Sequence, residues 1–433
     1  TIYRIAPDGA WYEGPGYWSY LFQSLSYEMA GYESAFGETD DVVSFKGMDG
    51  FAQYQMYFSD PSGNVNNFSD EGPIGCFGMF YLAKKFDQPA LMNYRASFIT
   101  SQNQTPTVYD LLWYDVNAAN STDSAELALD CYYRETELVT MRQEWNNENA
   151  LWVSAHGGSI NTAHDHIDAG IFVMNLGGVR WAVDLAKEPY SYVPDDQNPA
   201  IKAGLNSYYF YRRKGEGHNV VVINPDSGLE MDQAYDAKIV KTEFGLGRSY
   251  AVVDLSDVYN KNANSYLRGY LVSDGRSALT VRDEIDLKQD NSELYWFMHT
   301  EGQVVIEDNN TAYILQDGKQ LKLQFVTDAA ESELSVMPAE KLPTSAQFEE
   351  SENIGVQKVA LKLEASGKVN ITVKMSLVGE DASNAAPETT AIANWTTVGD
   401  DTVQPSATGC TQRLLGIKIN GENLETFKPE IFH

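Results

Sequence analysis

The chain has 433 residues, of which 43% are apolar, and its 31 Lys and Arg against 61 Asp and Glu give a formal net charge of −30. This length and apolar content allow two or more domains with their own cores, which excludes disorder as the main state. The acidic balance excludes a nucleic-acid binder, which would carry a basic stripe, and no apolar run approaches the ~18 residues that a membrane helix needs.

The first part of the chain is predicted to be helical. Trp18, Leu21, Phe22, Leu25 and Met29 form one stripe at helical spacing, in a helix expected from Gly16 onward. Breaks are expected where Pro and Gly interrupt the pattern near 60–63 and 105–106. Further helices are expected over 42–57, 75–86 and 88–100.

After about Thr136 the apolar period changes to two, which predicts antiparallel strands. Asp274-Gly275 lies between two such runs, 267–273 and 278–285, and predicts a hairpin turn. A long surface loop is expected over 379–409. Other strands are expected over 320–325, 359–363, 369–377 and 413–419. Helices followed by many short strands favour a helical part and a β-sandwich over an alternating α/β sheet.

Three cysteines, Cys76, Cys131 and Cys410, lie far apart without a CxxC pair. This spacing suggests neither a disulfide framework nor a thiolate zinc site, so any metal would be held by histidine and carboxylate. The chain begins at Thr1 without Met or a leader, and we therefore expect a processed product or a fragment.

Histidines are scarce, six in all, yet His156, His164 and His166 fall within eleven positions. In an extended segment His164 and His166 would point to the same face, so a strand could present two imidazoles to one metal. Asp184 and His218, each beside an apolar strand, are candidates for further ligands. The alternative is that these residues are hydrogen-bonded structural groups.

Residues 7–20 pack three tyrosines and two tryptophans around a turn that leads into the first helix. Exposed aromatic faces suit pyranose rings, and their polar tips bind hydroxyls. Tyr12, Glu13 and Trp18 are therefore candidate substrate contacts, although aromatic residues at a helix start also serve as core.

Five segments together resemble the heparinase II/III-like polysaccharide lyases, whose chains join a helical toroid to a β-sandwich. They are 7–18 (PDGAWYEGPGYW), 138–145 (LVTMRQEW), 164–173 (HDHIDAGIFV), 180–185 (RWAVDL) and 217–222 (GHNVVV). The resemblance covers most of the chain and implies an α+β multidomain fold, with C-terminal helices of an (α/α) toroid over 1–135 and a large antiparallel β-sandwich over 136–433. It also implies a bacterial protein that is periplasmic or secreted.

The resemblance implies β-elimination on a uronic-acid-containing polysaccharide, such as a glycosaminoglycan or alginate. Tyr17 matches the family's catalytic tyrosine, which protonates the leaving oxygen and often also acts as base. His164 matches the catalytic histidine, as a base or as a group that stabilises the substrate carboxylate. Both residues are the expected catalytic groups.

Arg142, Arg212 and Arg213 are candidate contacts for carboxylate or sulfate, because a guanidinium binds such groups in bidentate geometry. The formal net charge of −30, however, repels a polyanion. We therefore expect a lightly charged uronan in preference to highly sulfated heparin.

The family's structural metal, usually zinc, maps onto His166, Asp184 and His218, so one structural zinc ion is expected. The sequence departs from the family in one respect. In the family an Asn or His that neutralises the uronate lies well before the catalytic tyrosine, whereas only sixteen residues precede Tyr17 here. The expected partners are therefore an anionic polysaccharide or oligosaccharide and a missing N-terminal toroid segment or chain, with a homodimer as an option.

Two other functions compete with the lyase. The HxHxD pattern at His164 to Asp168 is also similar to the metal motif of metallo-β-lactamase-like hydrolases, but Ala169 stands where a further histidine follows in those enzymes. The two strands expected around 176–178 also disagree with the helix of that fold. A non-catalytic carbohydrate-binding protein on a lyase scaffold is the second alternative, although binding alone would require no proton donor.

Overall fold

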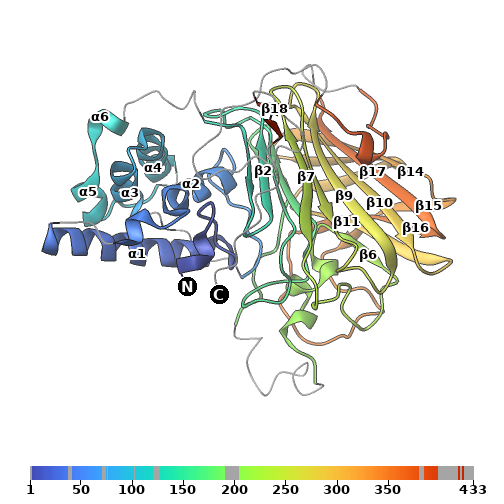
Figure 1. Ribbon diagram of the computed structural model, residues 1–433. Helices are drawn as coiled ribbons and strands as arrows, with labels where there is room; N and C mark the ends of the chain where they lie inside the picture. Colours follow the sequence, from blue (N-terminus) through green and yellow to red (C-terminus); the bar gives the residue numbers. More distant parts are fainter. Residues whose placement is uncertain are drawn as a thin grey trace.

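The computed structural model describes residues 2–37, 41–70, 75, 77–101, 103–119, 127–190, 204–379, 385–397, 418–419 and 422–423. The helices lie together on one side of the molecule and the sheets on the other (Figure 1). The predicted fold class, N-terminal helices followed by an antiparallel β-sandwich, is confirmed. Within these ranges, no helix has both the length and the apolar character that crossing a membrane requires.

Among the described residues, the first part of the chain forms six α-helices. They are α1 (Gly14–Phe36), α2 (Met48–Phe58), α3 (Met79–Lys85), α4 (Pro89–Ser101), α5 (Val108–Trp113) and α6 (Val116–Ala119). The helix predicted over 42–57 begins later than expected, because Gly47 adopts φ 93°. A Cβ at Gly47 would lie 2.4 Å from the carbonyl oxygen of Ile5, so the chain packs too closely there for any other residue.

The first strand after the helices, β1, begins at Asp130. The boundary between the helical domain and the β-sandwich domain, expected between residues 135 and 136, stays a prediction. The first sheet has the order β1-β2-β3-β4-β5. Its strands are β1 (Asp130–Tyr133), β2 (Leu138–Arg142), β3 (Trp152–His156), β4 (Ile171–Leu176) and β5 (Val179–Ala182). The turn at 177–178 joins β4 to β5, as the sequence predicts. Cys131 on β1 is disulfide-bonded, which the wide spacing of the cysteines did not suggest.

Two further antiparallel sheets complete the sandwich. One has the order β12-β13-β14-β17-β10-β9-β8-β7 and the other β15-β16-β11-β6. The strands are β6 (Val221–Ile223), β7 (Lys238–Phe244), β8 (Ser249–Asp254), β9 (Ala263–Ser273), β10 (Ala278–Leu287), β11 (Ser292–Thr300), β12 (Gln303–Asp308), β13 (Thr311–Gln316), β14 (Lys319–Thr327), β15 (Glu331–Pro338), β16 (Gln357–Ala365) and β17 (Lys368–Leu377). Apolar side chains from all three sheets share one core.

The hairpin predicted at Asp274-Gly275 is confirmed. Asp274 and Gly275 join β9 to β10 at φ 56° and 65°, the left-handed conformation that such turns require. The strand predicted over 413–419 falls mostly outside the described residues. Its last two residues are described, and they form β18 (Lys418–Ile419), which pairs with β19 (Glu422–Asn423). Part of the loop predicted over 379–409 is likewise not described.

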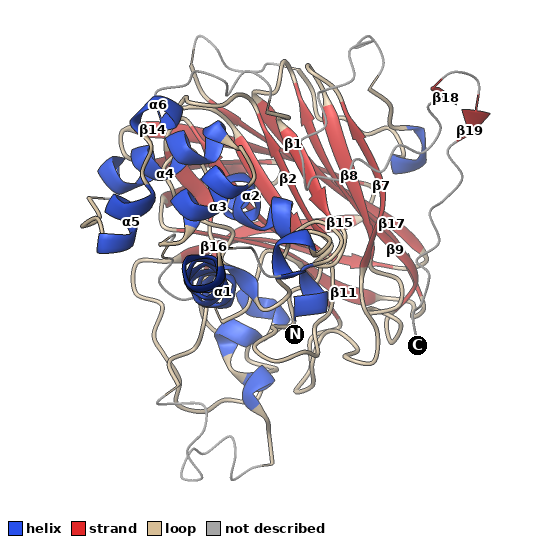
Figure 2. Cartoon of the chain, turned by 60° about the vertical axis from the view of Figure 1, so that its left-hand side comes forward, coloured by secondary structure: helices blue, strands red, loops and turns tan. Residues whose placement is uncertain are grey.

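The helices are anchored to the first sheet through the C-terminal end of α2. Arg142 of β2 donates to the carbonyl oxygens of Met56, Tyr57 and Ser59, and Trp152 of β3 donates from Nε1 to Tyr57 at 3.1 Å. These bonds satisfy carbonyls that the end of a helix leaves without partners. Figure 2 shows the helices packed in front of the sheets. The segment that follows α2 is therefore fixed against the sandwich, and it carries residues of the site.

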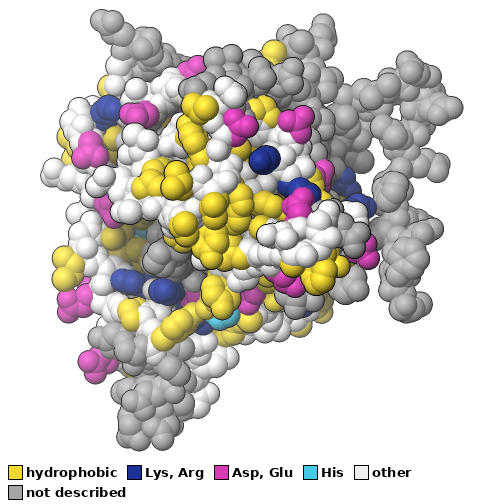
Figure 3. Space-filling model, turned by 90° about the vertical axis from the view of Figure 1, so that its left-hand side faces the viewer, with side chains coloured by type: hydrophobic (Ala, Val, Ile, Leu, Met, Phe, Trp, Pro, Cys, Tyr) yellow, Lys and Arg dark blue, Asp and Glu magenta, His cyan; other side chains and the backbone are white. Residues whose placement is uncertain are grey.

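The helical side of the molecule exposes large apolar side chains. Figure 3 shows hydrophobic side chains gathered on this face. Those that are more than half exposed lie on or beside α1, α5 and α6: Tyr20, Phe36, Val108, Leu111, Leu112 and Val116.

Candidate active site and metal centre

Two residues far apart in sequence, Tyr17 and His164, lie face to face. Their rings stack with centroids 4.0 Å apart at an interplanar angle of 19°. Tyr17 stands in the first turn of α1, and His164 lies in the loop between β3 and β4 at φ 70°. Glu13, the residue before α1, contacts this imidazole, with its Oε1 3.1 Å from Nδ1 of His164. The structure thus brings together the two predicted catalytic residues and Glu13.

The start of α1 is placed by a close backbone contact. Gly14 adopts φ 83°, and a Cβ there would lie 2.7 Å from the carbonyl oxygen of Phe68. Any side chain at this position would push α1 away from the segment that follows α2. Tyr17 is consequently positioned by that segment, which continues into Asp70.

The hydroxyl of Tyr17 belongs to a chain of hydrogen bonds. It lies 2.8 Å from the hydroxyl of Tyr190, which donates to Oδ2 of Asp70 at 3.1 Å. Burial, the bond to Tyr17 and the charge of Asp70 all raise the pKa of Tyr190, so it stays protonated. Because Tyr190 donates its proton to Asp70, its oxygen accepts the proton of Tyr17. The hydroxyl proton of Tyr17 therefore points to the oxygen of Tyr190.

Asp70 connects this chain to a second cluster. Its Oδ1 lies 3.1 Å from Nε2 of His166, its Oδ2 accepts from the guanidinium of Arg213, and its backbone N–H donates to the carbonyl of His164 at 3.1 Å. Burial would raise the pKa of Asp70, but the bonds and charges of His166 and Arg213 hold it below its ordinary value. Asp70 is an ionised acceptor at the centre of the site.

His166, Asp168 and His218 converge behind the catalytic pair. One ligand atom from each lies within 4.8 Å of those of the other two, and all three side chains are buried. His166 Nδ1, Asp168 Oδ2 and His218 Nε2 have no hydrogen-bond partner among the described residues. Buried polar atoms without partners are costly, and two imidazole nitrogens with one carboxylate oxygen form a donor set that suits zinc. These three residues fit the metal that the resemblance implies.

The structure gives Asp184 a different position from that predicted. Its Oδ2 lies 2.7 Å from Nδ1 of His218, on the far side of the imidazole from the unpartnered Nε2. Asp70 stands in the same way behind His166. Carboxylates in this position orient metal-binding histidines without being ligands themselves. Asp168, which the sequence analysis did not include among the ligands, lies together with His166 and His218, and the assignment of Asp184 as a ligand stays a prediction.

The segment that carries these groups is not the extended strand that the sequence suggested. Residues 161–170 form turns between β3 and β4, and the left-handed His164 breaks the alternation of faces. His164 therefore faces Tyr17 while His166 faces His218 and Asp70, so the two imidazoles serve different clusters.

Three predicted substrate contacts lie away from the site or are already engaged. Trp18 is fully buried, stacks on Phe22 at 4.5 Å and donates from Nε1 to Phe51, so the prediction that it contacts substrate is wrong. Arg142 is buried beneath the end of α2, so it too cannot reach a substrate. Arg212 donates from Nε to Asn353 at 2.9 Å and is partly exposed.

Tyr12, the remaining candidate, is partly exposed beside Glu13, with the Arg4 guanidinium 4.1 Å from its ring centre. Arg213, the third candidate arginine, is bonded to Asp70. Tyr190 and Asp70 were missed by sequence reasoning, because neither lies in a motif and both depend on contacts across more than a hundred residues.

A family model described as "Heparinase II/III-like, C-terminal" matches residues 133–396, more than half of the chain. The protein belongs to this family. A search of curated proteins found no match.

Three solved structures share the fold of this chain. A heparinase III structure matches with a TM-score of 0.64 and 14% identity, over 87% of this chain and 55% of that one. Another heparinase III matches with a TM-score of 0.63 and 13% identity, over 86% and 53%. The heparan sulfate lyase HepC from Pedobacter heparinus matches with a TM-score of 0.61 and 16% identity, over 89% and 55%. The chain spans about half the length of these proteins.

Proposed function

We propose that the protein is a polysaccharide lyase that cleaves a uronic-acid-containing polysaccharide by β-elimination. The observation that carries this proposal is the stacked pair of Tyr17 and His164, with the phenol proton directed by Tyr190 and the imidazole held by Glu13. Membership of the heparinase II/III-like family supports the same class of reaction.

His164 is suited to remove the proton. Because Oε1 of Glu13 accepts from Nδ1, the proton of a neutral imidazole lies on Nδ1 and the lone pair on Nε2. Nε2 takes the proton from C5 of the uronate, and the electrons of that C–H bond form the double bond between C4 and C5. Glu13 acts as a positioning residue that fixes the tautomer.

Tyr17 is suited to protonate the leaving group. As the C4–O bond breaks, the phenol proton of Tyr17 passes to the departing glycosidic oxygen, so the products are one unsaturated uronate end and one new hydroxyl. Before this step the hydrogen bond to Tyr190 holds the Tyr17 hydroxyl in place, and its proton then turns from the Tyr190 oxygen to the glycosidic oxygen. General acid catalysis of this kind contributes about 10²–10⁴-fold to a rate.

We assign one structural zinc ion to His166, Asp168 and His218, with Asp184 and Asp70 as the carboxylates behind the histidines. A bound ion would supply folding energy by joining two loops. Because His164 lies two residues before His166, the same loop sets the position of the imidazole that faces Tyr17.

The group that neutralises the substrate carboxylate is proposed to lie in further toroid helices. Support comes from the apolar face of α1 and α5, which is the kind of surface that helices pack against, and from the greater length of the solved relatives. A periplasmic or secreted location is part of the same proposal, and the disulfide at Cys131 supports it, since disulfides persist in oxidising compartments.

The test is the ultraviolet absorbance of the unsaturated uronate. The protein, alone and with any preceding residues that its gene encodes, is mixed with heparan sulfate, chondroitin, hyaluronan, alginate and other uronans. We expect a rise with at least one of them, its loss in Tyr17→Phe, and its retention in the control Tyr20→Phe, an exposed tyrosine on the same helix. No rise with any uronan in a folded, metal-bound protein would contradict the lyase and favour a carbohydrate-binding protein.

A further inference from the structure

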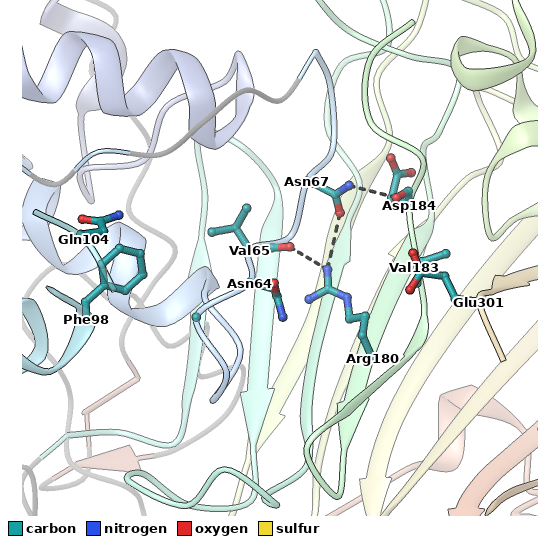
Figure 4. A pocket seen from close by; sticks show the side chains of 10 residues that line it. Asn64, Val65, Asn67, Phe98, Gln104, Arg180, Val183, Asp184 and Glu301 are labelled. Carbon is teal, nitrogen blue, oxygen red and sulfur yellow. Dashed lines mark hydrogen bonds between the residues drawn. The ribbon is translucent and has the colours of Figure 1, made fainter. Parts of the chain in front are cut away.

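A cavity of about 460 Å³ opens beside the metal cluster, and we call it the side pocket. Phe98 of α4 and Gln104 lie on one side of it, and Arg180 of β5, Asp184 and Glu301 lie on the other (Figure 4). A volume in this range is typical of pockets that bind small molecules or single units of a larger ligand. None of the roles assigned above uses this space.

The side pocket is joined to the catalytic pair by one short segment. Asn67, which lines the pocket, donates from Nδ2 to the backbone oxygen of Asp184 at 3.0 Å. Asp70, three residues further along, carries the hydrogen-bond chain to Tyr17, and three residues span at most about 11 Å. The side pocket and the hydrogen-bond chain to Tyr17 therefore share one segment, and a ligand of several sugar units is long enough to reach from one to the other.

The polar lining of the side pocket suits hydroxyl groups. Gln104 contributes an amide whose oxygen accepts from Arg95, which leaves its N–H groups for a ligand, and Glu301 contributes an exposed carboxylate. The amides of Asn64 and Asn67 are bonded to Asp60 and to the Asp184 carbonyl. An amide offers both donors and acceptors, as a sugar hydroxyl does, so the two groups can satisfy each other in several orientations. Phe98 adds an apolar wall.

The charges around the side pocket do not suit an anion. Arg180 is the one Lys or Arg among its described lining residues, and its guanidinium already contacts Asp60 at 3.1 Å and donates to the Val65 carbonyl at 2.6 Å. Asp184 and Glu301 bring two carboxylates, of which Asp184 is paired with His218. A sulfate or carboxylate in the pocket would meet Glu301 with no cation left to balance it.

We propose that the side pocket is a subsite for an uncharged sugar unit, in which Gln104 and Glu301 bind hydroxyls and Glu301 rejects sulfated units. This inference rests on the proposed function and narrows its substrate class to a uronan with uncharged sugar units near the cleaved bond. The formal charge of −30 agrees with a lightly charged substrate.

The test compares octasaccharides that differ only in sulfation: unsulfated chondroitin with 6-O-sulfated chondroitin, and N-acetylheparosan with 6-O-sulfated N-acetylheparosan. Binding is measured by calorimetry in a Tyr17→Phe background, which prevents turnover. The two informative variants are Glu301→Lys and its control Glu331→Lys, an exposed carboxylate on β15 whose reversal changes the net charge by the same amount.

We expect the unsulfated member of at least one pair to bind more tightly. Glu301→Lys should reduce that preference about fivefold or more, and Glu331→Lys should leave it within about twofold. Gln104→Ala should weaken binding of the unsulfated octasaccharide about two- to tenfold through a lost hydrogen bond.

Tighter binding of the sulfated members, or equal effects of the two charge reversals, would overturn the subsite. If the neutral preference and its dependence on Glu301 hold but no unsaturated product forms with any uronan, the subsite stands and the proposed lyase function fails.

Discussion

Tyr190→Phe tests whether the hydrogen-bond chain orients the proton of Tyr17. The substitution removes one hydroxyl and with it two contacts, the 2.8 Å bond to Tyr17 and the 3.1 Å bond to Asp70. Tyr190 is itself 43% exposed, so the phenyl ring can stay in place without an unpaired buried group of its own. The variant should fold normally and leave the Tyr17 hydroxyl without its acceptor.

The expected loss follows from the strength of one hydrogen bond. A neutral hydrogen bond contributes about 0.5–1.5 kcal/mol net, and about 1.4 kcal/mol corresponds to a factor of ten in rate. Tyr190→Phe should therefore lower kcat about two- to tenfold with KM within about twofold. Tyr17→Phe, which removes the proton donor itself, should lower kcat by about 10² to 10⁴.

The assay is the initial rate of unsaturated-uronate formation on whichever uronan is cleaved, together with a thermal melt of each variant. Tyr20→Phe is the matched control, because it removes a phenol hydroxyl three residues from Tyr17 on a 75% exposed side chain. A loss in Tyr190→Phe as large as that in Tyr17→Phe would make Tyr190 the proton donor. An unchanged kcat would show that the chain contributes nothing to catalysis.

Three further predictions address the metal ligands, the aromatic core and the pH dependence of stability. Asp168→Asn should abolish the metal-dependent rise in melting temperature, whereas Asp184→Asn should weaken metal affinity about 10–100-fold. Equal effects of the two variants in metal titrations would contradict the proposed ligand set. Trp18→Ala should cost about 3–5 kcal/mol of unfolding free energy in denaturant, and a stable variant with a raised KM would restore Trp18 as a substrate contact. Burial raises the pKa of Asp8 from 3.8 to about 7. Between about pH 4 and pH 7 the native state therefore keeps a proton on Asp8 that the unfolded chain has lost. The free energy of unfolding should consequently fall as pH rises from about 4 to about 7. Asp8→Asn should remove on the order of 4 kcal/mol of this fall in the free energy of unfolding. If the melting temperature of the variant drops between about pH 4 and pH 7 as much as that of the parent protein, Asp8 is not the group responsible.

Regular elements could be predicted from the sequence because their periodicity is local. The helix through Trp18, the hairpin at Asp274-Gly275 and the strands on either side of 177–178 all follow from spacing and turn chemistry within a few residues. That Tyr17 and His164 lie together also agrees with the resemblance of their segments to the family, and their catalytic roles stay a prediction.

Burial and partner choice could not be predicted in this way, because both depend on contacts between distant segments. Trp18 and Arg142 have the chemistry of substrate contacts, but one fills the core of the helical part and the other caps α2. Asp70 and Tyr190 have no distinctive sequence context, and 120 positions separate the two residues that form the link.

The proposed ligand set depends on a single backbone angle. A strand would place His164 and His166 on one face and leave Asp168 on that face as well, all aimed at one site. With His164 at φ 70°, the chain turns so that His164 faces Tyr17 while His166 and Asp168 face His218. One residue in the left-handed region thus separates the catalytic imidazole from the metal cluster.

Asp70 shows how the proposed metal site would be connected to the proposed reaction. Its Oδ1 is taken by His166, its Oδ2 by Arg213 and Tyr190, and its backbone N–H by the carbonyl of His164. A carboxylate with both oxygens engaged can satisfy all of these partners in one orientation, so a shift of His166 must be shared with Tyr190 and hence with the proton of Tyr17. The proposed zinc would thus act on the elimination through the position of Asp70, and its removal should lower kcat and thermal stability together while leaving the acid and base themselves intact.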